Sequence, residues 1–247
     1  MAGLTQSAPA RTSLGNTRFG QVDATAVAAE GRDELNNGQD YLLSYAGMRK
    51  TVGYFGIALP IVVFLIGFAL PPHQFLGSIS DYYYVPFAGS VFVGALWAIG
   101  VFLWFYDYAR ADNILTSSAG TFAIGVAVFP TSKDNLPLGI VSVATVHLVC
   151  AALFFAVLAV LSLFYFTRGD TESRPRKKIR NRIYVASGLI ILLALVVAAA
   201  GRAILGRESY NEHHVLFFCE TVACWAFGFS WLVKGQGLLR DLETTTP

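Results

Sequence analysis

The stretch I-Y-V-A-S-G-L-I-I-L-L-A-L-V-V-A-A-A-G, residues 183–201, decides the fold class of this chain. It consists almost entirely of Leu, Ile, Val and Ala, and it holds no charged residue. A helix that crosses the hydrocarbon core of a bilayer needs a run of about 17–25 apolar residues. This stretch therefore predicts a membrane-spanning helix whose surface faces lipid.

Five further apolar runs share the chain with it. The six predicted spans cover residues 54–70, 86–106, 114–129, 141–166, 183–201 and 214–233. The chain is 55% hydrophobic and 14% charged, whereas soluble domains carry about 25% charged residues. The sequence thus predicts an all-α polytopic membrane helix bundle with six transmembrane helices. The third run is rich in Ser, Thr and Gly, so it is predicted to be an inner helix of the bundle.

Lys and Arg are unevenly distributed between the predicted loops, and this bias gives the orientation. The loop between the fourth and fifth runs holds seven of them: Arg168, Arg174, Arg176, Lys177, Lys178, Arg180 and Arg182. The opposite side holds only Lys133, Arg202 and Arg207. The bias places both termini in the cytoplasm, which agrees with six spans and predicts a multi-pass protein of the bacterial plasma membrane.

The predicted membrane domain covers residues 46–235. Residues 1–45 are rich in small and polar residues and are expected to form a disordered or surface-lying cytoplasmic tail, and residues 236–247 a short cytoplasmic tail. The basic side chains expected to contact anionic lipid headgroups are Arg174, Arg176, Lys177, Lys178, Arg180 and Arg182. No aromatic residue interleaves these charges until Tyr184, so nucleic acid is not an expected partner. The oligomeric state is left open.

Glu220 is the most informative polar residue, because a carboxyl group inside a span is costly and usually faces the bundle interior. At about 1.5 Å per residue, Glu220 and His147 both lie roughly 9–10 Å below the outer edge. They are therefore expected to face each other across the bundle. The other candidates of this outer-half polar cluster are His213, His214, Ser80, Asp81 and Tyr84. The alternative is a buried, protonated carboxyl group that bonds to a Ser, Tyr or His neighbour and only holds helices together.

The run S-I-S-D-Y-Y-Y, residues 78–84, has two interpretations. Consecutive tyrosines suit the membrane interface, and a polar lid over an outer cavity is the functional alternative. The helical metal-binding spacing H-x3-H is absent, so no metal or other cofactor is predicted and no catalytic residue is assigned. Three cysteines, Cys150, Cys219 and Cys224, lie inside apolar runs and are interpreted as small buried hydrophobes.

Several segments resemble a family of uncharacterised bacterial integral membrane proteins of the DUF998 kind. They include R-K-T-V-G-Y-F-G-I-A-L-P at 49–60, S-I-S-D-Y-Y-Y at 78–84, A-G-T-F-A-I-G-V-A-V-F-P-T at 119–131 and F-G-F-S-W-L-V-K-G at 227–235. The resemblance covers about residues 45–235 and implies no particular activity. A much weaker similarity is to the CREST membrane hydrolases, whose zinc site needs an S-x3-H element. Here Tyr84 stands at the fourth place after Ser80, so that metal set does not carry over.

The sequence thus predicts an integral plasma-membrane protein of unknown biochemical activity, and three classes of function stay open. A small-molecule or proton-linked transporter or channel would use Glu220 and His147 along a pathway. A metal-dependent membrane lipid hydrolase would use the same cluster around a metal. A structural or sensory protein would use these residues for packing alone.

Overall fold

The computed structural model describes residues 24–71, 73–106, 110–131, 137–138, 141–168, 176–235 and 238–239. The chain divides into two compact units, Met1–Leu42 and Leu43–Pro247. The second unit contains the helical bundle. Where the sequence predicts a disordered or surface-lying tail over residues 1–45, helix α1 begins at Ala24, and residues 1–23 lie outside the described residues.

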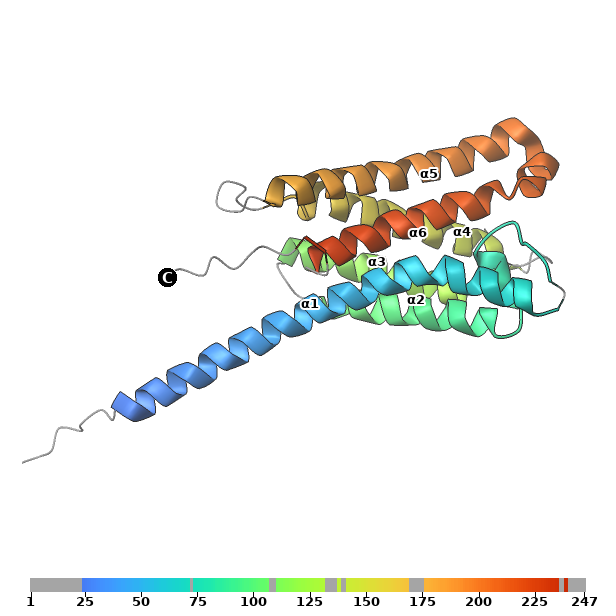
Figure 1. Ribbon diagram of the computed structural model, residues 1–247. Helices are drawn as coiled ribbons and strands as arrows, with labels where there is room; N and C mark the ends of the chain where they lie inside the picture. Colours follow the sequence, from blue (N-terminus) through green and yellow to red (C-terminus); the bar gives the residue numbers. More distant parts are fainter. Residues whose placement is uncertain are drawn as a thin grey trace, which may run out of the picture. The chain divides into compact units, whose positions relative to one another are not determined.

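Helices make up nearly all of the described structure (Figure 1). In chain order the elements are α1 (Ala24–Ala69), the 3-10 helix η1 (Ser80–Tyr84), α2 (Ala88–Trp104), α3 (Arg110–Val128), β1 (Pro137–Leu138), β2 (Val141–Ser142), α4 (Val143–Val160), the π-helix η2 (Leu161–Tyr165), α5 (Lys177–Glu212) and α6 (Val215–Lys234). The two short strands pair antiparallel, with Leu138 opposite Val141.

Within the described residues, four helices are long and apolar enough to cross a membrane. They are Ala46–Ala69 of α1, α4 together with η2 (Val143–Tyr165), α5 and α6. Two shorter apolar helices accompany them, α2 and the part of α3 from Asn113 to Val128. The all-α prediction is confirmed, and the apolar helices are those of an integral membrane protein.

The helices of the second unit run alongside one another, and neighbours in sequence are neighbours in space (Figure 1). Helix α2 packs against α3, α3 against α4, α4 against α5, and α5 against α6. Helix α6 also meets α1, where a Cβ added at Gly228 would lie 2.7 Å from the Gly53 carbonyl oxygen. Gly100 of α2 and Gly120 of α3 approach equally closely. Such glycines let helix backbones touch, as is common between membrane helices.

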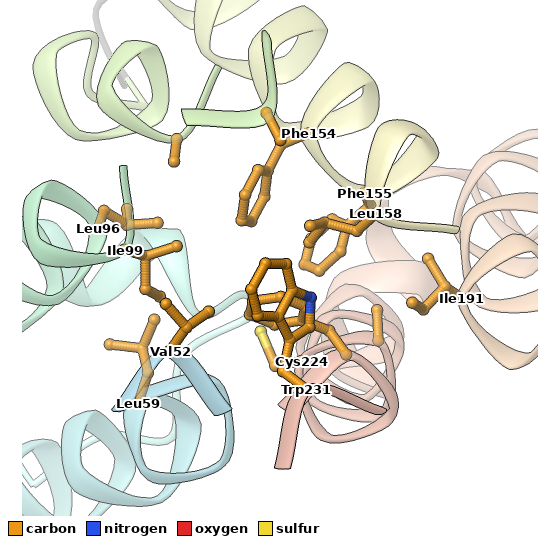
Figure 2. Close-up of a cluster of buried hydrophobic side chains, with 14 of the residues drawn as sticks. Val52, Leu59, Leu96, Ile99, Phe154, Phe155, Leu158, Ile191, Cys224 and Trp231 are labelled. Carbon is orange, nitrogen blue, oxygen red and sulfur yellow. The ribbon is translucent and has the colours of Figure 1, made fainter. Parts of the chain in front are cut away.

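The core of the bundle is aromatic and aliphatic (Figure 2). Trp231 of α6 lies in it, with its ring centroid 5.3–5.9 Å from those of Tyr106, Phe166 and Phe227. The labelled side chains around it come from α1, α2, α4, α5 and α6: Val52, Leu59, Leu96, Ile99, Phe154, Phe155, Leu158, Ile191 and Cys224. The apolar cluster therefore ties five helices together.

Burial separates α3 from α5 as their compositions predict. Ala119 and Ala123 of α3 are fully buried, whereas Leu193 and Val196 of α5 are 62% and 63% exposed. The small residues of α3 allow close approach on two sides, to α2 and to α4. The large aliphatic side chains of α5 cover the outside of the bundle, where a lipid environment suits them.

Two backbone features shape the end of the bundle at which α5 turns into α6. Gly206 has φ +74° and breaks α5, so the segment after it takes a new direction. His214 has φ +49°, a left-handed conformation, immediately before α6 begins at Val215. Together they return the chain so that the first turns of α6 face the segment between α1 and α2.

Candidate functional site

The segment of residues 75–84, here called the lid, is tied to the start of α6 by three hydrogen bonds. His214 donates from Nδ1 to the Leu76 carbonyl oxygen over 3.1 Å. The Phe217 backbone N–H donates to the Gly77 carbonyl oxygen over 2.9 Å. The two donors, His214 and Phe217, are three residues apart at the start of α6, and such residues lie on one face of a helix.

The third and deepest of these bonds involves Glu220. Its Oε2 accepts the backbone N–H of Ile79 at 2.6 Å, and the backbone N–H of Ser80 faces the same carboxylate. Ile79 and Ser80 begin the 3-10 helix η1, and the first N–H groups of a helix have no partner inside it. Glu220 therefore caps η1 from another helix.

Hydrogen bonds between its own residues also hold the lid in its conformation. Ser78 accepts the backbone N–H of Asp81 on its Oγ at 3.0 Å, and the Ser78 and Ser80 hydroxyls lie 3.1 Å apart. The Tyr82 ring is fully buried, and a Cβ added at Gly67 of α1 would overlap it. Burial raises the pKa of the Tyr82 phenol above its usual value. The lid is thus held to α6 by hydrogen bonds and to α1 by the Tyr82 ring.

A small cavity of about 40 Å³ lies beside the lid. Its polar lining residues are Ser80, His147 and Glu220. The other lining residues are apolar or small: Gly56, Leu59, Ile79, Phe92, Leu96, Ile99, Val126, Ala151, Phe154, Phe155, Cys224 and Phe227. The polar lining residues come from the lid, α4 and α6, and α1, α2 and α3 supply apolar lining residues.

His147 is 3% exposed and its orientation is fixed by one short hydrogen bond. Its Nδ1 lies 2.6 Å from the carbonyl oxygen of Phe129, the residue after α3 ends. A carbonyl oxygen can only accept, so Nδ1 carries the proton, and Nε2 is the hydrogen-bond acceptor of the neutral ring. Sequence spacing placed His147 and Glu220 at one depth. They line the same cavity, but each bonds to backbone rather than to the other.

The remaining predicted site residues have separate places. His214 fastens the lid and stacks on Phe75, with ring centroids 3.9 Å apart. His213 is exposed and donates to the Ser209 carbonyl oxygen of its own helix. Tyr84 is half exposed and lines a separate open groove. Asp81 is half-buried and sits in the lid. Across the described residues, no group of three His, Cys, Asp or Glu side chains could hold a metal ion.

The basic segment at the start of α5 divides into two kinds of residue. Lys177 is buried and donates from Nζ to the carbonyl oxygens of Phe166 and Arg168, at 3.3 and 2.7 Å, next to the end of η2. Arg180 is buried and donates to the Leu239 carbonyl oxygen. Lys178 and Arg182 are exposed, and Arg174 lies outside the described residues.

Two parts of this site have no signature in the sequence. The partners of Glu220 and His147 are backbone groups, at Ile79 and Phe129, and every residue type carries such groups. The capping role of Glu220 therefore required the tertiary structure. The one available signal was the S-I-S-D run at 78–81, whose small hydroxyl and carboxylate residues favour the starts of turns and helices.

Comparison of the chain with protein-family models, with curated proteins and with solved structures finds no match. The resemblance to bacterial membrane proteins of the DUF998 kind therefore stays a prediction.

Proposed function

We propose that this chain is an integral protein of the bacterial plasma membrane with six spans and both termini in the cytoplasm. Four helices have the length for a span. The two shorter ones, α2 with 17 residues and α3 with 19, extend over about 25 and 28 Å at 1.5 Å per residue. This is close to the roughly 30 Å hydrocarbon core of a bilayer. Helix α2 packs against α3, and α3 packs against the long helix α4.

The orientation is tested by placing single cysteines at the two ends of α5. Lys178 and Glu212 are both exposed, so Lys178→Cys and Glu212→Cys should accept a membrane-impermeant thiol reagent. In intact cells only Glu212→Cys should be labelled, and Lys178→Cys should require opened membranes. The chain without these substitutions serves as the control, because any labelling of it comes from its own three cysteines. Labelling of Lys178→Cys in intact cells would reverse the proposed orientation.

On the cytoplasmic side, Lys178 and Arg182 are the basic residues proposed to contact anionic lipid headgroups. Their side chains are exposed, while Lys177 and Arg180 bond backbone carbonyl oxygens of the protein. Exchanging both for Gln should reduce the amount of phosphatidylglycerol that co-purifies with the protein, measured by mass spectrometry. Equal amounts in the variant would argue against these contacts.

For the outer half of the bundle we propose a small-solute binding site of a transporter or channel, in which the lid controls access. The observation that carries this proposal is the position of Glu220, a residue that lines the cavity and whose Oε2 also fastens the lid at Ile79. Breaking this contact therefore loosens the lid at the point where Ile79 and Ser80 line the cavity, while the bonds at Leu76 and Gly77 remain.

Cys224 provides the test, because it lines the same cavity and is 8% exposed. In a chain with Cys150→Ser and Cys219→Ser, a small water-soluble thiol reagent added from outside should react slowly with Cys224. Glu220→Leu should accelerate this reaction about fivefold or more, because the buried Ile79 N–H loses its partner. The matched control is Glu208→Gln, which removes an exposed carboxylate of α5. An unchanged rate in Glu220→Leu would contradict the lid.

A structural role for the same contacts is the second candidate, and the three hydrogen bonds from the lid to α6 favour it. It predicts that Glu220→Leu lowers the thermal unfolding temperature while Cys224 keeps its slow reaction. The metal-dependent lipid hydrolase gains no support, because the described residues offer no three-residue metal set.

A further inference from the structure

Three helices line the cavity beside the lid with the same spacing of residues. Helix α6 contributes Glu220, Cys224 and Phe227, which are four and three residues apart and therefore lie on one face of the helix. Helices α2 and α4 contribute stripes of the same spacing, which begin at Phe92 and at His147. At about 1.5 Å per residue, each stripe extends over roughly 10 Å. The lining therefore runs along the helices, away from the lid.

The small side chains of these stripes stand in the middle. Ala151 and Cys224 are the second residues of their stripes, and Leu96 is the second residue of the stripe on α2. The third residues of the other two stripes are Phe154 and Phe227, whose rings meet edge to face with centroids 6.1 Å apart. Figure 2 shows Leu96, Phe154 and Cys224 in one apolar cluster. Short side chains in the middle, with aromatic rings beyond them, leave the space that larger residues would fill.

The lining of the cavity suits an apolar occupant better than water. Its polar residues, Ser80, His147 and Glu220, each have a hydrogen-bond partner in the protein already. The side chains of the other lining residues carry no hydroxyl, amide or charged group. A buried water makes about three hydrogen bonds to polar groups that would otherwise be unpaired, whereas apolar cavities stay dry.

The volume of the cavity sets an upper limit on the occupant. It measures about 40 Å³, which is more than the 10–15 Å³ or so that one water molecule needs. It is well below the roughly 150 Å³ of an apolar protein cavity that binds benzene. A cavity of this volume, with a lining drawn out along three helices, fits a molecule of two or three heavy atoms.

We propose that this cavity binds a neutral, apolar molecule of two or three heavy atoms, the class to which O2 and CO2 belong. The phenylalanine residues of the lining supply dispersion contacts, and the molecule leaves water for an apolar environment. The proposal rests on the small-solute site inferred above and names the class of solute.

The test uses xenon, which is neutral, apolar and inert, and which binds in dry apolar cavities of proteins. The full chain, in lipid nanodiscs and with isotope-labelled Ile, Leu and Val methyl groups, is observed by NMR while the xenon pressure rises. The methyl shifts of Leu96 and Ile99 should saturate. Those of Leu193 and Val196, which are 62% and 63% exposed, should change in proportion to the pressure, because xenon also dissolves in lipid. Helium at the same pressures controls for pressure alone.

Two further probes test the size of the molecule that binds. Nitrous oxide, a linear neutral molecule of three heavy atoms, should give saturable shifts at the same methyl groups, whereas benzene should not. Leu96→Ala enlarges the cavity and should admit benzene, observed at the Ile99 methyl groups. Absence of a benzene response in Leu96→Ala would overturn the proposal.

Variants that narrow the cavity show whether xenon binds there. Ala151→Val narrows it from α4 and Cys224→Val from α6, and both should abolish the saturable shift of Ile99. The matched control is Ala152→Val, which adds the same volume as Ala151→Val at the neighbouring exposed position and should keep the saturable shift.

Three results would contradict an apolar ligand in this cavity. The Ile99 shift could grow only in proportion to xenon pressure, or it could still saturate in both narrowing variants. The third result is a long-lived water with nuclear Overhauser contacts to the Ile99 methyl groups that xenon does not displace. The reaction of Cys224 tests the lid separately, so lid opening without a xenon response would overturn only the class of solute.

Discussion

The substitution Glu220→Leu should free the lid by an amount that follows from one contact. Leucine fills a similar volume but accepts no hydrogen bond, so the Ile79 N–H loses its partner at 2.6 Å. Leaving a buried N–H group without its partner costs about 1–3 kcal/mol. At about 1.4 kcal/mol per factor of ten, the open population of the lid should rise about 5- to 150-fold. Glu220→Gln keeps a neutral acceptor, and a loss of about 1 kcal/mol corresponds to roughly fivefold.

Amide hydrogen exchange measures this opening directly, because local opening sets the rate at which a protected N–H exchanges. The protein in lipid nanodiscs is labelled with deuterium, and peptides that cover residues 75–84 are followed by mass spectrometry. Their exchange should accelerate in the order wild type, Glu220→Gln, Glu220→Leu. Peptides from the middle of α5 should exchange as in the wild type, since the substitution leaves the α5 contacts in place.

The matched control lies next to Glu220 in sequence. Thr221 is buried, and within the described residues its Oγ1 has no hydrogen-bond partner. Thr221→Val keeps the shape of the side chain and should leave lid exchange within about twofold of the wild type, because no hydrogen bond is lost. The reasoning is refuted if Glu220→Leu exchanges the lid no faster than Thr221→Val does.

Three further outcomes are expected. Gly228→Ala should lower the unfolding free energy by about 1–3 kcal/mol, because the new Cβ would lie 2.7 Å from the backbone of α1. Gly94→Ala is the control and should not lower it, because nothing lies within 4 Å of the new Cβ. Thermal unfolding compares the two variants. Ser162→Ala removes a buried hydrogen bond of 3.2 Å to the Ser230 hydroxyl and should lower the unfolding free energy by only about 0.6 kcal/mol in the same assay. A decrease several times larger would contradict this expectation. Because burial raises the pKa of Tyr82, its contribution to stability is complete below the unfolded value near 10 and is lost as the pH rises through the folded value. Unfolding temperatures between pH 8 and 11 should therefore fall less steeply in Tyr82→Phe.

Much of the fold followed from hydrophobic patterning, because a bilayer constrains sequence more strongly than water does. Much of the aliphatic run at 183–201 is exposed, as at Leu193 and Val196, and several small residues of α3, such as Thr116, Ala119 and Ala123, are buried. A spanning helix satisfies its own backbone hydrogen bonds, so its existence depends on local composition alone. The cost of a carboxyl group inside such a helix likewise pointed to Glu220.

The sequence by itself determined that this is a helical membrane protein and which polar residues needed an explanation. Only the tertiary structure decided what those residues contact. His147 and Glu220, which helical rise predicted to lie at one depth, line one cavity, yet they bond to Phe129 and Ile79 through backbone groups that no residue type identifies. The direction in which α6 meets the lid depends on the break at Gly206 and the left-handed turn at His214. Contacts between elements distant in the chain arise from packing, and packing is a property of the whole bundle rather than of any one segment.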